Sequence, residues 1–510
     1  MKKLSREEYL DKMQGCWLGK CIGGTLGAPF EAHRNIRELD YYTVDLSSGM
    51  LPNDDLDLQL VWLNAAERYK TEITAEILAD YWLLSIVPNW AEYGVGKGNL
   101  RAGIPAPVSG KYNNRFKDSN GAWIRSEIWA CLAPGHPEIA VKYAYEDACV
   151  DHADEGVYSE IFTAALESAA FAESDKFKLI DIALSFIPDE CATALAVKKI
   201  VELYKSGLDW NSARIEIMKA YPSSFGGQLG DSEEGIPNGS WGFDAPSNVA
   251  ITLIGWLWAE DDFGKAICIT SMCGEDTDCT AGTIAAVLGI IMGASRIPEK
   301  WSDPIGDKIV TKCVSTFARG VKIPKTIGDL CGRVANLMPS FMLNSVNVMG
   351  DGSDFITMND GDDLYSKPAK VMDGANGWDL RYFKNELPSG YTFRARSMFY
   401  DCRIEAPNGI DIANGERLQL DLRIDNVAGF YSMPLHLEAN WITPEGVRIE
   451  GGNKHAIFVN QVHCSNGRAE KSFTVAADDI RDPYVKLTLE LRVMSYATRI
   501  YIPVTLVKKS

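Results

Sequence analysis

Two short acidic segments at the start of predicted helices hold the residues best suited to chemistry in this sequence. The first reads Asn-Asp-Asp-Leu-Asp at 53–57, and the second reads Glu-Asp-Thr-Asp-Cys-Thr at 275–280. One such residue is enough to cap a helix, because its side chain accepts backbone N–H groups and offsets the helix dipole. Two adjacent ionised carboxylates repel each other, and a divalent cation removes that cost. Oxygen ligands favour magnesium, manganese or calcium over zinc, so the spacing leaves helix capping and a metal site both open.

The N-terminal segment offers a further carboxylate at the end of a glycine-rich predicted helix. Its glycines at 15, 19, 23 and 27 are four residues apart, so on a helix they line one face. A face without side chains lets a second helix pack closely. The segment ends in Pro29-Phe30-Glu31, where an isolated glutamate would ordinarily be a surface residue.

Taken together, these segments resemble the ADP-ribosylglycohydrolase family, which includes the dinitrogenase reductase-activating glycohydrolase. That family opens with a glycine-rich helix ending in Glu, as in 15–31, followed by Thr-Asp-Asp, here Asn-Asp-Asp at 53–55. It later has Gly-x-Asp-x-Asp-Thr, here 274–279, and an Asn-Gly-x-x-Met-Arg loop that 120–125 resembles. Ile-Pro-Glu-Lys-Trp at 297–301 is similar to the usual ending. The ordered set covers roughly residues 10 to 340.

The resemblance implies an all-α bundle with a centre of two Mg²⁺ or Mn²⁺ ions. It implies catalytic roles for Glu31, Asp55 and Asp278, with Glu31 beside the ions. The candidate metal ligands that match by position are Asn53, Asp54, Asp55, Asp276, Asp278 and Cys279. The candidate substrate contacts are Asn120, Gly121, His152 and Tyr158. From the residues alone, His152 can equally be a structural residue near a helix start.

Three positions depart from the family pattern. Asn53 stands for the Thr of Thr-Asp-Asp, and its amide oxygen can still bind a cation. Cys279 stands for the Thr after the last Asp, and a thiol is a poor ligand for a hard cation. Gly24 stands where many members have Asp. We expect these changes to affect the metal positions or the substrate more than the fold.

The implied activity is hydrolysis of the glycosidic bond at the ribose anomeric carbon of an ADP-ribosyl or related ribosyl compound. Its substrate would be an ADP-ribosylated small molecule or protein. Two alternatives remain open, a metal-independent glycoside hydrolase that uses two carboxylates and a non-catalytic protein that binds ADP-ribose or a nucleotide. Trp241 and Phe243, in a glycine-rich loop, can stack on a base or close the core.

Composition argues against several other classes of protein. The formal net charge of −18 repels nucleic acid and anionic membranes, so we expect neither as a partner. The twelve cysteines form no Cys-x-x-Cys pair, a pattern typical of free thiols in a reducing compartment. The N-terminus lacks the apolar core of a signal peptide, and no apolar run is long enough to span a membrane. We therefore expect a cytoplasmic protein of undetermined oligomeric state.

The pattern of apolar residues divides the 510 residues into regions. Residues 1–345 have helical periodicity and predict the all-α ADP-ribosylglycohydrolase-like catalytic domain. Residues 346–375 are polar and rich in turn formers, which predicts a linker or an irregular edge of the first domain. Residues 376–510 alternate with period two, as at 418–424 and 487–493, and predict an antiparallel, immunoglobulin-like β-sandwich with an accessory role.

Overall fold

The computed structural model describes most of the chain and divides it into two compact units. The described residues are 2–34, 38–221, 243–315, 321–342, 345–349, 353–365, 391–396, 400–427, 434–462, 467–494 and 499–509. One unit comprises Met1–Leu100 and Ser109–Ser366, and it is mainly helical. The other comprises Arg101–Val108 and Lys367–Ser510, and its regular structure is mainly strand.

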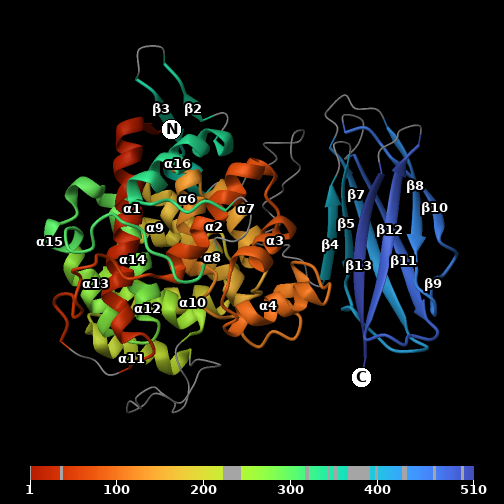
Figure 1. The fold of residues 1–510 in the computed structure, drawn as a ribbon, viewed down its shortest axis with the longest axis horizontal. Coiled ribbons are helices and arrows are strands. Elements are labelled where there is room, and N and C mark those ends of the chain that lie inside the picture. Colours follow the sequence, from red (N-terminus) through yellow and green to blue (C-terminus); the bar gives the residue numbers. More distant parts are fainter. Residues whose placement is uncertain are drawn as a thin grey trace. The chain divides into compact units, whose positions relative to one another are not determined.

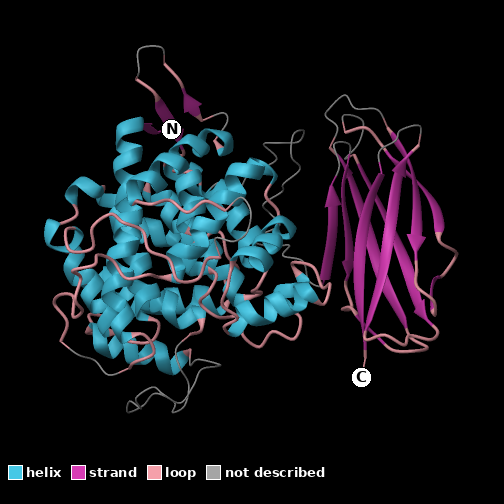
Figure 2. Cartoon of the chain, viewed as in Figure 1, coloured by secondary structure: helices cyan, strands magenta, loops and turns pink. Residues whose placement is uncertain are grey.

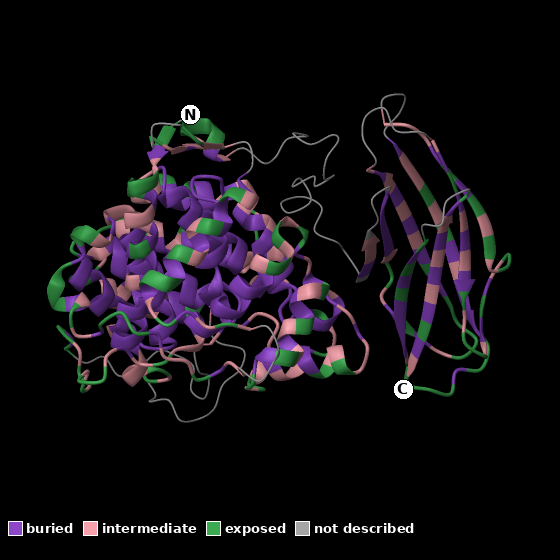
Figure 3. Ribbon diagram, turned by 45° about the horizontal axis from the view of Figure 1, so that its top comes forward, coloured by how far each residue is buried: buried purple, intermediate pink, exposed green. Residues whose placement is uncertain are grey.

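The helical region packs its helices around a dense buried core (Figures 1 and 3). Its α-helices are α1 (Arg6–Gly27), α2 (Asp54–Tyr69), α3 (Ala75–Ser85), α4 (Ala91–Arg101), α5 (Val108–Lys111), α6 (Glu127–Leu132), α7 (Pro137–Ala148), α8 (Glu155–Ala170), α9 (Lys176–Leu184), α10 (Ala192–Lys205), α11 (Trp210–Ala220), α12 (Ala245–Trp258), α13 (Phe263–Met272), α14 (Thr277–Met292), α15 (Glu299–Ser302) and α16 (Ile327–Phe341). A 3₁₀ turn, η1 (Ala28–Phe30), follows α1, and another, η3 (Trp123–Arg125), precedes α6. The predicted helical fold of this region is confirmed.

Helices α1 and α14 lie in direct backbone contact, as the glycine spacing predicts. A Cβ added to any of the four glycines would overlap a backbone carbonyl oxygen of α14. The opposed pairs are Gly15 with Gly289, Gly19 with Ala285, Gly23 with Ala281, and Gly27 with Thr277. The pairs run in opposite sequence directions, so the helices are antiparallel. The end of α1 therefore lies beside the start of α14, where the two segments that hold Glu31 and Asp276 meet.

A small three-stranded sheet, not predicted from the sequence, joins the N-terminus to residues beyond 345. Its strands are β1 (Lys2–Ser5), β3 (Phe355–Met358) and β2 (Val346–Asn347), in the order β1-β3-β2 with antiparallel pairing. Strands β2 and β3 and the 3₁₀ turn η5 (Gly361–Tyr365) lie in the segment expected as a linker or irregular edge. They belong to the helical unit, which extends to Ser366.

The second unit has two five-stranded sheets, which confirms the predicted antiparallel β architecture (Figure 2). One sheet has the order β4 (Tyr391–Arg396), β5 (Tyr400–Ala406), β7 (Arg417–Asn426), β11 (Arg468–Ala477), β9 (Val447–Ile449). The other has the order β10 (Lys454–Val459), β8 (Leu435–Ile442), β12 (Tyr484–Val493), β13 (Arg499–Lys508), β6 (Asp411–Ile412). All pairs are antiparallel except the short β13–β6 pair. The rings of Trp441 on β8 and Phe473 on β11 lie 5.4 Å apart, so the sheets face each other.

The cysteines behave as the sequence predicts. Eleven of them are free and buried, and the twelfth, Cys464, lies outside the described residues. Among the helices that the structure describes, none has the length and apolar character needed to cross a membrane.

Candidate metal centre

Three carboxylates converge where the end of α1 meets the start of α14. Glu31 follows η1, Asp276 caps α14, and Asp278 lies in the first turn of that helix. Each offers an oxygen within 4.8 Å of the other two, close enough to share one cation. Glu31 keeps contact with solvent, whereas Asp276 and Asp278 are buried. The Oδ1 atom of Asp278 is buried without a hydrogen-bond partner, so it is suited to bind a cation.

A tight turn ahead of α14 fixes this arrangement. Gly274 and Glu275 both have positive φ, at 77° and 68°, and Glu275 is one of the few non-glycine residues that do so. The Glu275 carboxylate pairs with the guanidinium of Arg34, and its carbonyl oxygen accepts the N–H of Ala32 at 2.8 Å. The turn thereby ties the residues that follow Glu31 to those that precede Asp276.

Helix α2 brings the Asn-Asp-Asp segment to the same place. Asn53 caps the helix, because its Oδ1 accepts the N–H of Asp55 at 2.8 Å, while its buried Nδ2 has no partner. A Cβ at Gly24 would meet that Nδ2, so the absence of a side chain at 24 makes room for Asn53. The carboxylate of Asp54 accepts the hydroxyl of Tyr93 at 3.3 Å and pairs with Nζ of Lys312 at 3.2 Å.

Asp55 has protein donors at both of its oxygens. Nζ of Lys20 lies 3.0 Å from Oδ2, and Sγ of Cys279 donates to Oδ1 at 3.3 Å. Asp55, Asp278 and Cys279 form a second group with ligand atoms within 4.8 Å of one another. The last acid of the segment, Asp57, faces away from both groups and accepts the backbone N–H groups of residues 312 and 313.

The crowding of acidic groups raises their pKa values. Burial, with the charges of Glu31 and Asp54, raises the pKa of Asp278 to about 7. Burial, opposed by the nearby Lys20 ammonium, raises the pKa of Asp55 to about 7 as well. Burial and the charge of Asp278 raise the pKa of Asp276 well above its usual range. A divalent cation would reverse these shifts by stabilising the ionised carboxylates.

The loop at residues 119–121 forms the facing wall and orients Asp276. Nδ2 of Asn120 donates to Oδ2 of Asp276 at 2.7 Å, and its Oδ1 accepts the indole N–H of Trp123 at 2.9 Å. The carbonyl oxygen of Gly121 accepts Nη1 of Arg125 at 2.6 Å. Arg125 is buried and forms ion pairs with Asp147 and Asp151, so the loop rests on a fixed charge network.

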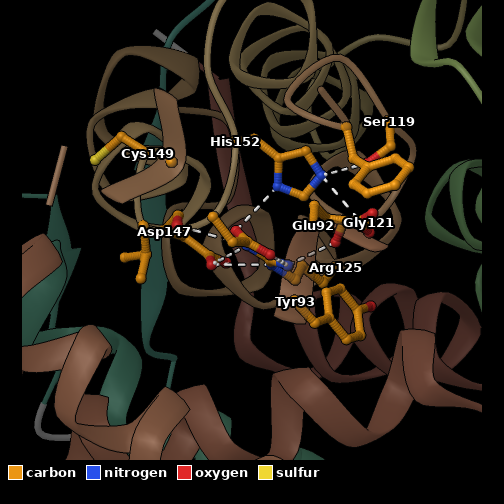
Figure 4. A network of polar contacts seen from close by, with 12 residues as sticks. Glu92, Tyr93, Ser119, Gly121, Arg125, Asp147, Cys149 and His152 are labelled. Carbon is orange, nitrogen blue, oxygen red and sulfur yellow. Dashed lines mark hydrogen bonds and ion pairs between the residues drawn. The ribbon is translucent and has the colours of Figure 1, made fainter. Parts of the chain in front are cut away.

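His152 lies within that network rather than on the wall of the pocket (Figure 4). Its ring is fully buried, with Nδ1 2.9 Å from Oδ1 of Asp151 and Nε2 3.0 Å from Oγ of Ser119. Its Nε2 also faces Glu92 at 3.9 Å. Ser119 and Glu92 do line the pocket, so His152 supports two wall residues from behind.

The carboxylates open into a pocket of about 450 Å³. Glu31, Asp54, Asp276 and Asp278 line it together with the predicted residues Asn120, Gly121 and Cys279. Asn53, Asp55 and Tyr158 are outside its lining. The aromatic side chains of Trp90, Tyr93 and Phe243 form another part of the wall, while Trp241 lies outside the described residues.

Several residues of this site were missed from the sequence. Besides Glu92 and Ser119, Trp90, Tyr93 and Lys312 line the pocket, and Lys20 contacts Asp55. The burial of Lys20 could have been expected, because this lysine directly follows Gly19 on a helix whose glycine spacing predicts close packing. The others come from loops or helix starts that carry no distinguishing pattern.

The helical region matches a known protein family. A model of the family "ADP-ribosylglycohydrolase" matches residues 5–334. A solved "ADP-ribosylglycohydrolase-related protein complex" is 18% identical, with 66% of this chain and 98% of that chain covered and a TM-score of 0.39. Two further solved structures are similar over shorter stretches. They are a FixG-related protein from Vibrio parahaemolyticus (14% identity, 18% and 80% covered, TM-score 0.15) and the GAE domain of GGA2p from Saccharomyces cerevisiae (15%, 22% and 96%, TM-score 0.16).

No functionally curated protein matches the sequence significantly. The likenesses to solved structures are weak, and the family match carries the assignment because it spans well over half of the chain. The chain therefore belongs to the ADP-ribosylglycohydrolase family and is a hydrolase of glycosidic bonds.

Proposed function

We propose that this chain hydrolyses the bond at the ribose anomeric carbon of an ADP-ribosyl or related ribosyl compound, and that it needs Mg²⁺ or Mn²⁺ to do so. The observation that carries the proposal is the cluster of Glu31, Asp276 and Asp278 at one end of a pocket. Their donor atoms are all oxygens, which favours a hard divalent cation. The unpartnered Oδ1 of Asp278 and the raised pKa of Asp276 both fit such an ion.

A bound divalent ion would supply charge with which to orient ribose hydroxyls and polarise the reacting oxygen. Within the chain, Glu31 is the carboxylate of the cluster that reaches solvent, so it can take a proton from an incoming water. In the metal-free protein, burial and the charge of Asp54 raise the pKa of Glu31. Asn120 holds Asp276 in place through its 2.7 Å hydrogen bond.

The rest of the pocket supports a nucleotide-containing substrate. Trp90 is exposed and stacks on Tyr93 with ring centroids 6.1 Å apart and an interplanar angle of 29°. Such an exposed aromatic face can stack on an adenine ring. Lys312, whose Nζ lies 5.8 Å from the centre of the Trp90 ring, adds a positive charge that can face a phosphate. The substrate would be an ADP-ribosylated small molecule or protein.

The decisive experiment is hydrolysis of a panel of ADP-ribosylated arginine, serine and nucleoside compounds. We expect release of ADP-ribose or ribose with Mg²⁺ or Mn²⁺ present, loss of release in excess chelator, and recovery when the metal is returned. Asp278→Ala should not turn over at any metal concentration, whereas Asp181→Ala, at a distant surface, should behave as the wild type.

Two outcomes would contradict the proposal. Full activity in chelator would favour a metal-independent hydrolase that uses two carboxylates. Tight nucleotide binding without turnover across the panel would favour a binding protein.

A further inference from the structure

Lys20 occupies a built, buried site directly against Asp55. Its side chain is 1% exposed, and its Nζ lies 3.0 Å from Oδ2 of Asp55 and 2.8 Å from Oε1 of Glu127. Its Nζ also donates a hydrogen bond to Oγ1 of Thr283 at 3.1 Å. Two ion pairs and one hydrogen bond therefore hold Lys20 as a fixed positive charge beside the two carboxylates.

The surroundings of Lys20 are shaped to keep it there. Nε2 of Gln59 donates to Oε2 of Glu127 at 2.7 Å, which holds that carboxylate toward the ammonium. Gly282 of α14 leaves space for the lysine stem, because a Cβ there would lie 3.3 Å from Cδ of Lys20. A lysine that pointed here by accident would not have an oriented carboxylate and a glycine opposite.

The other oxygen of Asp55 is also engaged. The thiol of Cys279 donates a hydrogen bond to it at 3.3 Å. A cation that bound Asp55 would therefore have to displace both the Lys20 ammonium and this thiol donor. Positions 24, 53 and 279, which depart from the family pattern, all lie on this side of the centre.

The opposite group of carboxylates is balanced differently. Within the described part of the chain, neither Glu31, Asp276 nor Asp278 forms an ion pair with a lysine or arginine. Lys312, the nearest pocket cation, is paired with Asp54 instead. Three carboxylates this close together, without an ion pair to the chain, need a bound cation to offset their charge.

We propose that the centre holds a single divalent ion, at Glu31, Asp276 and Asp278, and that the Lys20 ammonium takes the place of a second ion at Asp55. This rests on the proposed metal dependence and changes the expectation of two ions. Asp55 is then a carboxylate neutralised by the protein, and Cys279 is its hydrogen-bond donor. The centre is then asymmetric: one positive charge is an exchangeable metal ion, and the other is the ammonium of Lys20.

Titration of the full-length protein with Mn²⁺ tests this proposal. Calorimetry should give one ion per chain, and the paramagnetic resonance spectrum should be that of isolated Mn²⁺ at saturation. Two ions per chain, or the spectrum of a coupled pair, would overturn the inference and leave the proposed function intact. Absence of any binding would contradict both.

Two variants distinguish the roles of the aspartates. Asp278→Asn should weaken Mn²⁺ binding by at least about tenfold, whereas Asp55→Asn should change it by less, because only the former removes a ligand. Equal losses in both variants would contradict the inference. This comparison uses binding alone, so it does not depend on knowing the substrate.

Removal of the lysine charge is the complementary test. Lys20→Met should raise the Mn²⁺ stoichiometry from one to two, because Asp55 loses its fixed partner. The matched control is Lys12→Met, which removes a partly buried lysine of the same helix whose Nζ donates to the carbonyl oxygen of Ile290; it should stay at one. A folded Lys20→Met protein that still binds one ion would contradict the role of Lys20. If Lys20→Met does not fold, the Mn²⁺ stoichiometry of the wild type and the comparison of Asp278→Asn with Asp55→Asn still test the proposal.

Discussion

Two groups of carboxylates in the helical unit differ in their surroundings. Asp147 and Asp151 are buried and share the guanidinium of Arg125, with contacts of 2.9 and 2.7 Å. Glu31, Asp276 and Asp278 lie within reach of one another without such a partner among the described residues. The first group is neutralised by the chain and holds loops in place, while the second is left with excess negative charge beside a pocket. Between these two groups, charge balance separates the structural carboxylates from the candidate ligands.

Substitution in the unbalanced group should have the largest effect on activity. We expect Asp278→Asn to lower kcat/KM by at least about 10³-fold, equivalent to about 4 kcal/mol. Its melting temperature without metal should stay the same or rise, because a repelling charge is removed. Steady-state kinetics and thermal unfolding check the two expectations. A clear loss of stability in the absence of metal would place Asp278 with the structural carboxylates.

Substitution in the balanced group should act on stability. Arg125→Met leaves Asp147 and Asp151 buried without their cation, which we expect to cost about 3–5 kcal/mol in the free energy of unfolding. The matched control is Arg333→Met, since Arg333 forms a more exposed pair with Glu67, and its loss should cost less than about 1 kcal/mol. Denaturant unfolding measures both. Similar small losses would show that the buried network is not balanced as described.

The stability of the metal-free protein should depend on pH through its buried aspartates. The pKa values of Asp55, Asp57 and Asp278 are each raised to about 7 by burial, above those of the unfolded chain. The folded protein therefore binds more protons than the unfolded chain between about pH 4 and 7, so stability falls as pH rises through this window. We expect the metal-free protein to melt several degrees lower at pH 8 than at pH 5.5.

A divalent ion should counter part of that loss. Because it binds the ionised carboxylates of the folded state, Mn²⁺ should raise the melting temperature more at pH 8 than at pH 5.5. Thermal scans at both pH values, with and without Mn²⁺, give the four melting temperatures to be compared. A metal effect that is equal at both pH values would contradict ligation by carboxylates of raised pKa.

The smallest expected effect concerns the aromatic wall, away from either group of carboxylates. Trp90→Ala should raise KM for an ADP-ribosyl substrate by roughly tenfold and leave kcat nearly unchanged, since stacking contributes on the order of 1–2 kcal/mol. Tyr501→Ala, which removes a similarly exposed aromatic from the β unit, is the control. An unchanged KM for Trp90→Ala would contradict the proposal that Trp90 stacks on the adenine ring.

Local patterns in the sequence predicted the elements well. The glycine spacing of α1 predicted close packing, because helical periodicity alone determines which residues share a face. The family resemblance implied that the two acidic motifs and Glu31 lie together, and Asp54, Asp276 and Asp278 do line the same pocket as Glu31. Glu275 pairs with Arg34 instead, and Asp57 accepts backbone N–H groups. Period-two alternation predicted the β unit, as at Leu420 and Leu489, which are both fully buried.

What could not be predicted depends on partners distant in sequence. Lys20 meets Glu127 and Thr283, and Lys312 meets Asp54, across separations that no local pattern encodes. Tyr158 matches the family by position, yet it lies outside the pocket lining. Strand β3 was missed because it pairs with the N-terminal strand β1, about 350 residues away along the chain, and the short strand β2 pairs only with β3.

The contact between α1 and α14 also limits how this centre can change. At its four spaced glycines, α1 meets the backbone of α14 directly, so no side chain can be added there without moving the helices apart. Inserting one residue into α1 would turn everything beyond it by about 100°, so that bulkier side chains would meet α14 in place of glycine. Small shifts of the two helix backbones are therefore not tolerated. The chemistry of the centre can change only when one side chain replaces another on the same backbone.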